Sequence, residues 1–337
     1  MISWNVSRSL PEKLRNPQFV SMISKYDIIC LCECWINPYD EIHLDGYNRY
    51  VCPRKVKSPR KVKGGGIVIF YKCFLNQRIT LYENFFDSVM CLKVECVTEN
   101  PIFLMFCYIP PENSTFYERN DVNFFLILEQ LYTKVKNSGD VYIFGDFNAR
   151  TADYNDYIMY DTLPIDGPIL NMFDDYFEDL VPTKRKNMDK CVNTFGRYLL
   201  EFCKSTGVRI ANGRVNGDEC GSITFYSKRG FSLIDYVITE NTCLSNITEF
   251  ESGTFSEFSD HSPVSFCIPF KDYVTHNTPS AGAYHYRYIF KIVITATYPL
   301  PLQKTLRYRY TRKYTLPLHS LFRSPATYAC TVQPIHA

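Results

Sequence analysis

The stretch Val141-Tyr142-Ile143-Phe144-Gly145-Asp146-Phe147-Asn148 decides the fold, because it joins a buried strand directly to a polar turn. Its four consecutive apolar residues predict a strand covered on both faces, and Gly145 marks the end of that strand. Asp146 and Asn148 follow at once, and a carboxylate within apolar sequence is costly to bury unless it is paired or bound to a metal. The pattern therefore predicts a polar site at the end of a buried strand.

The same arrangement recurs at other predicted strands. The further cases are Trp4-Asn5-Val6, Glu33 after Ile28–Cys32, Asp235 within Leu233–Ile238, and Asp260-His261 before Pro263–Ile268. One such residue alone is best explained as a hydrogen-bonded structural group. Together they supply carboxylates and amides for a hard divalent cation, and one histidine for proton transfer. This combination indicates a metal-assisted hydrolase that acts on phosphate esters.

The remaining apolar patterns predict an α/β protein in which strands outnumber helices. Strands are predicted at 67–71, 89–94, 102–109 and 222–226, and helices at 121–136 and 195–203. Because the helices fall between strands, we expect a layered sandwich with helices on the outer sheet faces.

Net charge divides the chain into two unlike parts. The whole chain carries +2, but residues 1–272 hold 29 basic and 35 acidic residues, whereas residues 273–337 hold 8 basic residues and no acidic one. That last part has no periodicity that fits an element. We therefore predict one domain over residues 1–270 and an irregular basic tail over 271–337, disordered or non-native.

Composition also excludes several classes of protein. No apolar run approaches the ~18 residues of a membrane span, and the first residues lack a secretory signal pattern. The fourteen cysteines have neither disulfide-scaffold nor zinc-site spacing, and the run Cys30-Leu31-Cys32-Glu33-Cys34 is best explained by buried free thiols. We expect a reducing compartment, the nucleus or the cytoplasm, with no membrane association.

The motifs resemble, in order and spacing, the endonuclease/exonuclease/phosphatase superfamily with its DNase I-like fold. Within it, the sequence is most similar to the apurinic/apyrimidinic-type endonuclease domain of LINE-type non-LTR retrotransposons, from residue 1 to about 270. The motifs that carry the resemblance are Trp4-Asn5-Val6, Glu33, Tyr108-Ile109-Pro110-Pro111, Gly145-Asp146-Phe147-Asn148, Gly196–Cys203, Asn212-Gly213-Arg214, Gly221–Phe225, Ile234-Asp235-Tyr236 and Ser259-Asp260-His261-Ser262-Pro263.

The resemblance implies a four-layer α/β sandwich, in which two mainly antiparallel sheets pack together and helices lie outside. It also implies a Mg²⁺ site, with Mn²⁺ as the alternative cation. Glu33 would be the principal ligand with Asn5 beside it, and Asp260 would support the metal or the phosphate side. Ser7 stands where many relatives carry a carboxylate or amide, which leaves one metal or two as an open question.

The resemblance also implies catalytic roles. Asp146 would activate the attacking water, oriented by Asn148, and His261 would contact the scissile phosphate with its tautomer held by Asp235. The groups implied to bind phosphate are Tyr108, Thr224, Asn148 and His261. The expected substrate is DNA, nicked on one strand by a monomer for which no protein partner is identifiable.

Two alternatives stay open at this point. The same machinery would serve a phosphatase or phosphodiesterase acting on a small molecule or lipid, and a catalytically dead nucleic-acid-binding remnant would retain the same fold. The sequence Pro-Arg-Lys-Val-Lys occurs at 53–57 and again at 59–63. This repeat is equally compatible with a solvated loop and with a loop that contacts phosphates.

Overall fold

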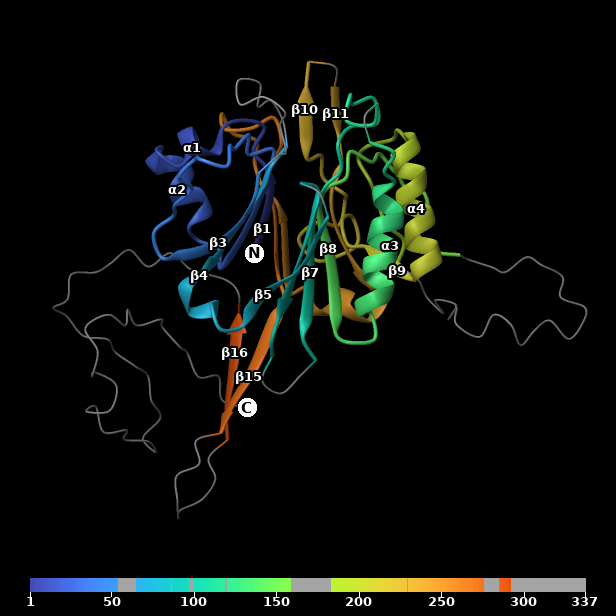
Figure 1. The fold of residues 1–337 in the computed structure, drawn as a ribbon. Helices are drawn as coiled ribbons and strands as arrows, with labels where there is room; N and C mark the ends of the chain where they lie inside the picture. The colour runs from blue at the N-terminus through green and yellow to red at the C-terminus, as the bar shows by residue number, and fades with distance from the viewer. Residues whose placement is uncertain are drawn as a thin grey trace, which may run out of the picture.

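The apolar strands assemble into two six-stranded sheets that lie face to face (Figure 1). The computed structural model describes residues 1–53, 65–85, 87–96, 100–118, 120–158, 183–228, 230–275 and 285–291. Each sheet contains one parallel pair, β1 with β2 or β7 with β8, and its other pairs are antiparallel. The expectation of two mainly antiparallel sheets is confirmed.

The two sheets draw their strands from distant parts of the chain. The first sheet has the order β13 (Glu249–Ser252), β14 (Val264–Cys267), β1 (Ile2–Asn5), β2 (Ile28–Cys32), β4 (Ile67–Lys72) and β3 (Tyr47–Cys52). The second has the order β5 (Ile79–Phe85), β6 (Val89–Val94), β7 (Ile102–Tyr108), β8 (Asp140–Asp146), β12 (Asp235–Glu240) and β9 (Val208–Ile210). The short strands β10 (Phe225–Ser227) and β11 (Gly230–Ser232) form a separate hairpin.

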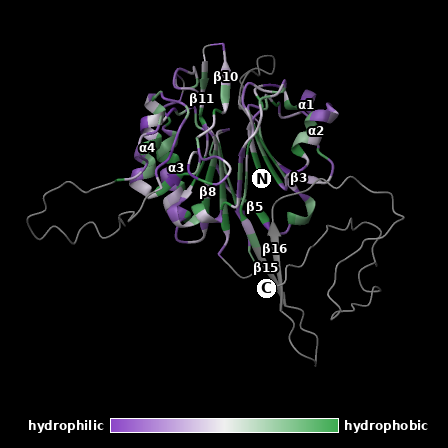
Figure 2. Cartoon of the chain, turned by 180° about the vertical axis from the view of Figure 1, so that it is seen from behind, coloured by the Kyte–Doolittle hydropathy of each residue, from purple (hydrophilic) through white to green (hydrophobic). Residues whose placement is uncertain are grey.

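Helices complete the sandwich on both outer faces. Helices α1 (Leu10–Lys13) and α2 (Pro17–Ile23) cover the first sheet, and α3 (Phe124–Val135) and α4 (Thr194–Thr206) cover the second (Figure 1). One apolar cluster lies between the sheets, and two others lie between a sheet and its helices. Figure 2 shows the same layering, with hydrophobic strands inside and hydrophilic residues along the helices. These layers confirm the four-layer α/β sandwich.

Local signals set the ends of the helices. The side-chain oxygen of Asn193 accepts a hydrogen bond from the backbone N–H of Gly196 at 2.7 Å, which caps α4. Gly207 ends the helix at φ +79°, in the left-handed region that favours glycine. The helix predicted at 195–203 is therefore confirmed, and it runs to Thr206.

The strand predicted at 222–226 differs from the structure. Residues 222–224 are irregular, because the carboxylate of Asp218 accepts hydrogen bonds from both the backbone N–H and the hydroxyl of Ser222, at 2.9 Å each. Regular pairing begins only at Phe225. A side chain has here taken the backbone donor that a sheet would need.

Several predictions concern residues that the structure does not describe. Positions 54–64, which hold most of the basic repeat, lie outside the described residues, as do 159–182 and 292–337. Within the predicted tail, β16 (His285–Lys291) pairs antiparallel with β15 (Pro269–Thr275). The division at residue 270 stays a prediction.

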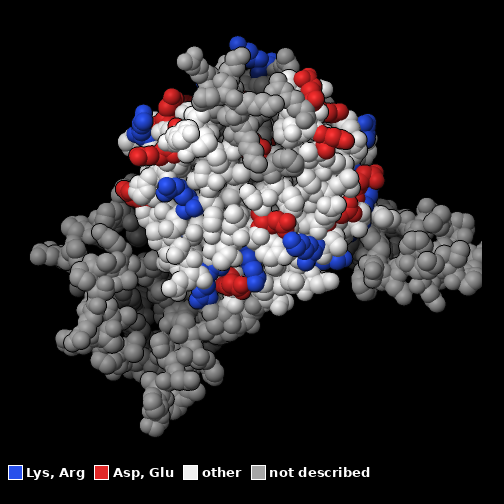
Figure 3. Space-filling model, viewed as in Figure 1, with Lys and Arg blue, Asp and Glu red and all other residues white. Residues whose placement is uncertain are grey.

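The described surface shows mixed charge. On the face drawn in Figure 3, basic and acidic side chains are interspersed rather than gathered by sign. None of the helices in the described part of the chain has the length and apolar character needed to cross a membrane.

A buried ion pair fastens the loop after β8 to the segment after β9. Both guanidinium nitrogens Nη1 and Nη2 of Arg214 donate to the Asp156 carboxylate at 2.8 Å, and the backbone N–H of Ile210 donates to it at 2.8 Å. Burial alone would raise the pKa of Asp156, but the guanidinium and these hydrogen bonds outweigh it and hold the pKa below its ordinary value.

Replacing Arg214 by Met should therefore destabilise the protein strongly. The change leaves the Asp156 carboxylate buried without its cation, and the expected loss is about 3–5 kcal/mol in the free energy of unfolding, measured by urea denaturation. In the wild type, the stability that corresponds to the lowered pKa of Asp156 is present above about pH 4. It is lost as the pH falls through the pKa of folded Asp156.

The matched control is Arg197→Met, on the exposed face of α4. Its cost should stay within about 0.5 kcal/mol, as for most surface changes. Equal losses in the two variants would show that the Asp156–Arg214 pair does not stabilise the fold.

Candidate active site

The two sheets meet through polar side chains at one end of the sandwich. Asn5 is the last residue of β1 in the first sheet, and Asp146 is the last residue of β8 in the second. The side-chain nitrogen Nδ2 of Asn5 donates to Asp146 Oδ2 at 2.8 Å, and both residues are buried. The structure thus brings together two predicted site residues that lie far apart in the sequence.

The turn after β8 holds Asp146 from its other side. Asp146 Oδ1 accepts from the backbone N–H of Asn148 at 2.9 Å, and Asp146 Oδ2 lies 3.3 Å from Asn148 Nδ2. Asn148 Nδ2 also donates to the carbonyl oxygen of Ile109 at 2.9 Å. Gly145 permits this turn at φ +138°, since a Cβ there would lie 1.9 Å from the carbonyl oxygen of Cys107.

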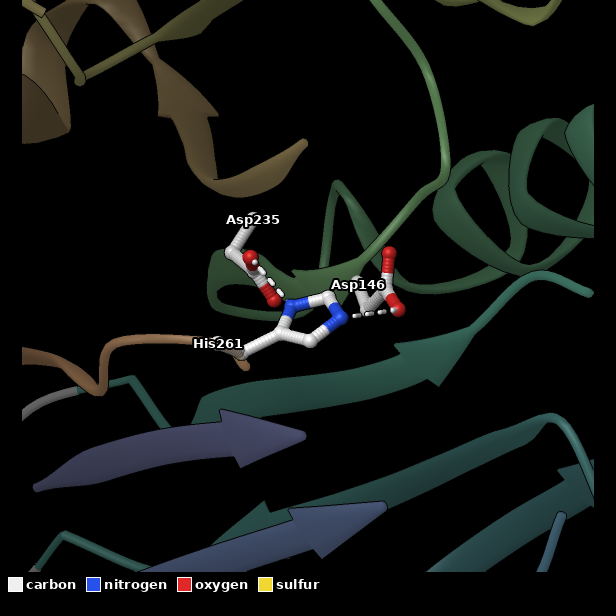
Figure 4. Close-up of side chains that lie close together, drawn as sticks. All are labelled: Asp146, Asp235 and His261. Carbon is white, nitrogen blue, oxygen red and sulfur yellow. Dashed lines mark hydrogen bonds and ion pairs between the residues drawn. The ribbon is translucent and has the colours of Figure 1, made fainter. Parts of the chain in front are cut away.

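His261 lies between two carboxylates (Figure 4). The antiparallel pairing of β12 with β8 sets Asp235 directly opposite Asp146. Asp235 Oδ2 lies 2.9 Å from His261 Nδ1, and Asp146 Oδ2 lies 3.9 Å from His261 Nε2. The indole N–H of Trp4 donates to the His261 carbonyl oxygen at 2.8 Å, so the end of β1 also holds the histidine in place.

Burial and these neighbours shift the pKa values of Asp146 and His261. Burial raises the pKa of Asp146 to about 7, and the nearby charge of Asp235 adds to the effect. Burial opposes the charge on His261, but Asp235 and then Asp146 outweigh it and raise the pKa of His261 to about 9. At neutral pH the histidine is therefore a cation, and its neighbour Asp146 is poised to take up a proton.

Glu33 and Tyr108 form the other side of the site. Glu33 follows β2 at φ +50°, and Tyr108 is the last residue of β7, opposite Asp146 in the parallel register. The Tyr108 hydroxyl donates to Glu33 Oε1. Burial, followed by the charge of Glu33, raises the pKa of Tyr108 well above its ordinary value, so the hydroxyl keeps its proton as a donor.

The donor groups suit a divalent cation. Ligand atoms of Asp146, Asp235 and His261 lie within 4.8 Å of one another, so this buried group could hold a metal ion once His261 has released its proton. Tyr108 occupies one oxygen of Glu33, and no described residue donates to the other. Carboxylate and amide oxygens are the donors that Mg²⁺ takes in proteins.

Two predicted residues lie apart from this group. The exposed Asp260 accepts a hydrogen bond from the Ser7 hydroxyl, which ties the loop before β14 to the loop after β1. Thr224 is fully buried, and its Oγ1 accepts from the backbone N–H groups of Ile234 and Asp235 at 3.2 Å. Thr224 therefore lies beneath the site, where it fixes the start of the strand that carries Asp235.

The sequence patterns did not reveal a supporting ion pair. Arg150 Nε and Nη2 donate to the two oxygens of Asp189, at 2.8 and 2.6 Å, and the backbone N–H of Leu233 donates to Asp189 Oδ2 at 3.3 Å. Asn193 accepts from the Arg150 backbone and donates to the Asn148 carbonyl oxygen at 2.9 Å. Only the helix cap at Asn193 gave a signal that could have found this network.

The raised pKa of His261 predicts a pH-dependent stability. The ion pairing that raises the pKa of His261 stabilises the folded state fully below pH 6.5. This stabilisation is lost as the pH rises through about 9, so the free energy of unfolding of the metal-free protein should fall over that window. In Asp235→Asn the histidine loses its main partner, so its pKa should fall by at least about one unit.

Proton NMR titration of His261 and urea unfolding between pH 6 and 10 check both statements. An unchanged His261 titration in Asp235→Asn would contradict this account of the electrostatics.

Comparisons with known proteins agree with this geometry. A search of the curated proteins finds no match. Among solved structures, the chain is similar to an AP endonuclease of Leishmania major, at 16% identity over 79% of this chain and 86% of that one, with a TM-score of 0.55. It is also similar to the 3′ phosphatase NExo of Neisseria bound to product DNA hairpin, at 14% identity, 79% and 98% coverage and a TM-score of 0.51.

A third similar structure is the endonuclease domain of TRAS1, a telomere-specific non-LTR retrotransposon. The identity is 13%, the coverage is 79% of this chain and 96% of that one, and the TM-score is 0.50. At such identities these likenesses establish the fold, and they confirm the predicted DNase I-like sandwich. The model of the endonuclease/exonuclease/phosphatase family matches residues 2–261. The chain therefore belongs to the endonuclease/exonuclease/phosphatase family.

Proposed function

We propose that the protein is a Mg²⁺-dependent endonuclease that nicks one strand of DNA, and that it derives from a non-LTR retrotransposon. The observation that carries the proposal is the buried group formed by Asp146 and Asp235, on paired strands of the second sheet, and by His261, from the loop before β14 of the first sheet. The names of the similar structures support it, since they include an AP endonuclease, a phosphatase bound to a DNA product and a retrotransposon endonuclease domain.

Asp146 is the residue suited to activate water. Its pKa of about 7 lies near the working pH, where a general base is most effective. Asn148 lies against the same carboxylate and has its side chain fixed by the Ile109 carbonyl oxygen, so it can orient the water. In our proposal the proton of the attacking water moves to Asp146 as the oxygen approaches phosphorus.

His261 is the residue suited to stabilise the charge that develops on phosphate. Asp235 fixes Nδ1 and keeps the ring protonated, so Nε2 presents an N–H on the Asp146 side. A positioned donor of this kind acts mainly on the transition state, in which the phosphate oxygens gain charge. Asp235 therefore acts through His261.

Glu33 and Asn5 are the residues that would hold the cation, Mg²⁺ or alternatively Mn²⁺. When bound, such an ion polarises a phosphate oxygen and stabilises the negative charge of the displacement. Tyr108 keeps Glu33 in place and brings a hydroxyl donor to the same side of the site. Asp260 would support the cation side through Ser7, by holding the loop that carries His261 against the end of β1.

Plasmid nicking tests the proposal. Purified protein should convert supercoiled plasmid to the open circle with Mg²⁺ and not with EDTA. Glu33→Gln and Asp146→Asn should each lower the rate by about 10²-fold or more, because each removes a group needed in the transition state. Glu201→Gln, on the exposed face of α4, is the matched control and should nick at the wild-type rate.

Other outcomes distinguish the alternatives. Hydrolysis of inositol phosphates without plasmid nicking would contradict the proposal and indicate a small-molecule phosphatase. Salt-dependent DNA binding without cleavage in any divalent cation would contradict it in favour of a catalytically dead remnant.

A further inference from the structure

The segment 183–190, Thr-Lys-Arg-Lys-Asn-Met-Asp-Lys, exposes and buries its residues in strict alternation from Lys184 onward. The exposed positions include three lysines, Lys184, Lys186 and Lys190, and the buried positions are Arg185, Asn187 and Asp189. A solvated loop would not bury every second polar side chain. The alternation instead indicates a segment with one anchored face and one presented face.

The buried face is held by hydrogen bonds. Arg185 Nη2 donates to the Ala152 carbonyl oxygen at 2.9 Å, and Asn187 Nδ2 donates to the same oxygen at 2.7 Å. Asp189 forms the bidentate ion pair with Arg150. These contacts attach the segment to the loop that begins with the catalytic turn after β8.

The backbone is held as firmly as the side chains. The N–H of Lys186 donates to the Gly213 carbonyl oxygen at 2.9 Å, and the N–H of Met188 donates to that of Gly221 at 3.0 Å. Both glycines adopt positive φ, and a Cβ on Gly213 would lie 1.9 Å from the Lys186 carbonyl oxygen. The glycines thus allow the close approach that fixes the outward direction of the lysines.

The segment lies at the same end of the sandwich as the active site. Arg150 follows Asn148 by two residues, and Leu233, whose N–H donates to Asp189, precedes Asp235 by two. The segment that carries the lysines is therefore bonded to the backbone next to the catalytic turn and next to the start of β12. Among the described residues, the amines of Lys184 and Lys186 have no hydrogen-bond or ion-pair partner, which leaves them available to a ligand.

We propose that Lys184, Lys186 and Lys190, here called the basic ridge, bind the phosphate backbone of duplex DNA beside the cleavage site. This inference rests on the proposed DNA substrate. The six steps from Lys184 to Lys190 span at most about 20 Å, and each DNA strand places one phosphate per ~3.4 Å of helix axis, so the three amines have room to contact three separate phosphates.

The chemistry of the ridge favours a duplex over a single strand. Single-strand sites combine positive charge with aromatic side chains on which bases stack, and the presented face of the ridge has none. Lys190 Nζ donates to the Asn187 carbonyl oxygen at 2.6 Å, which leaves two of its N–H groups, and it lies 3.8 Å from the Asp153 carboxylate, with both side chains more than half exposed. An exposed pair of this kind is weak, so phosphate can replace the carboxylate.

The salt dependence of DNA binding tests the ridge. Binding of the full chain to a duplex of about 20 base pairs is followed by fluorescence anisotropy in EDTA, between about 50 and 200 mM salt. The variant Lys184→Gln/Lys186→Gln/Lys190→Gln should lower the slope of log affinity against log salt by about 0.9 for each phosphate that the protein no longer neutralises, or about 3 in total.

The matched control is Lys25→Gln/Lys136→Gln/Lys204→Gln, which removes the same charge at the opposite ends of the sheets, after α2, after α3 and late in α4. Its slope should equal that of the wild type. Equal slopes in the ridge variant and the wild type, or equal decreases in the two variants, would overturn the ridge as a binding surface. A ridge-dependent slope for single-stranded DNA or for RNA but not for the duplex would overturn the assigned partner.

The proposed nuclease activity is judged separately by plasmid nicking of the wild type. Nicking with an unchanged slope in the ridge variant rejects the ridge and leaves the function in place. A ridge-dependent slope without any nicking supports the ridge as a DNA surface and rejects the nuclease.

Discussion

The hydrogen bond from Asn5 to Asp146 is the interaction on which the candidate site depends. It joins the last residue of β1 to the last residue of β8, and so it fixes the spacing of the two sheets at one end. A buried carboxylate without partners would be strongly destabilising, so the fold must bring donors to Asp146 from both sheets. The amide of Asn5 supplies one, and the turn through Asn148 supplies the other.

Strand pairing then places a second carboxylate beside the first. Because β12 runs antiparallel to β8 with Asp235 opposite Asp146, two buried acids would repel each other if both were ionised. The cationic ring of His261 lies between them and offsets that repulsion. The interactions that stabilise this end of the sandwich are therefore the same ones that, in the proposed function, prepare a base and a donor for chemistry on phosphate.

The sequence predicted the buried strands and the polar residues at their ends, because unbroken apolar runs and the abrupt change at Gly145 are local signals. It did not predict the basic ridge or the Arg150–Asp189 pair. In segment 183–190 the buried face is made of arginine, asparagine and aspartate, so its alternation is invisible to hydropathy. Likewise, only tertiary contacts show that Thr224 lies beneath the site rather than at its surface.

In the proposed function, side chains from both sheets form one active site, and a double-mutant cycle on plasmid nicking in Mg²⁺ tests this most directly. Glu33 follows β2 of the first sheet, and Asp146 ends β8 of the second. If they act on one transition state, Glu33→Ala/Asp146→Ala should lose about as much rate as the more damaging single variant. If the double variant instead loses rate by the product of the two single-variant factors, the two residues act independently and the single active site is contradicted.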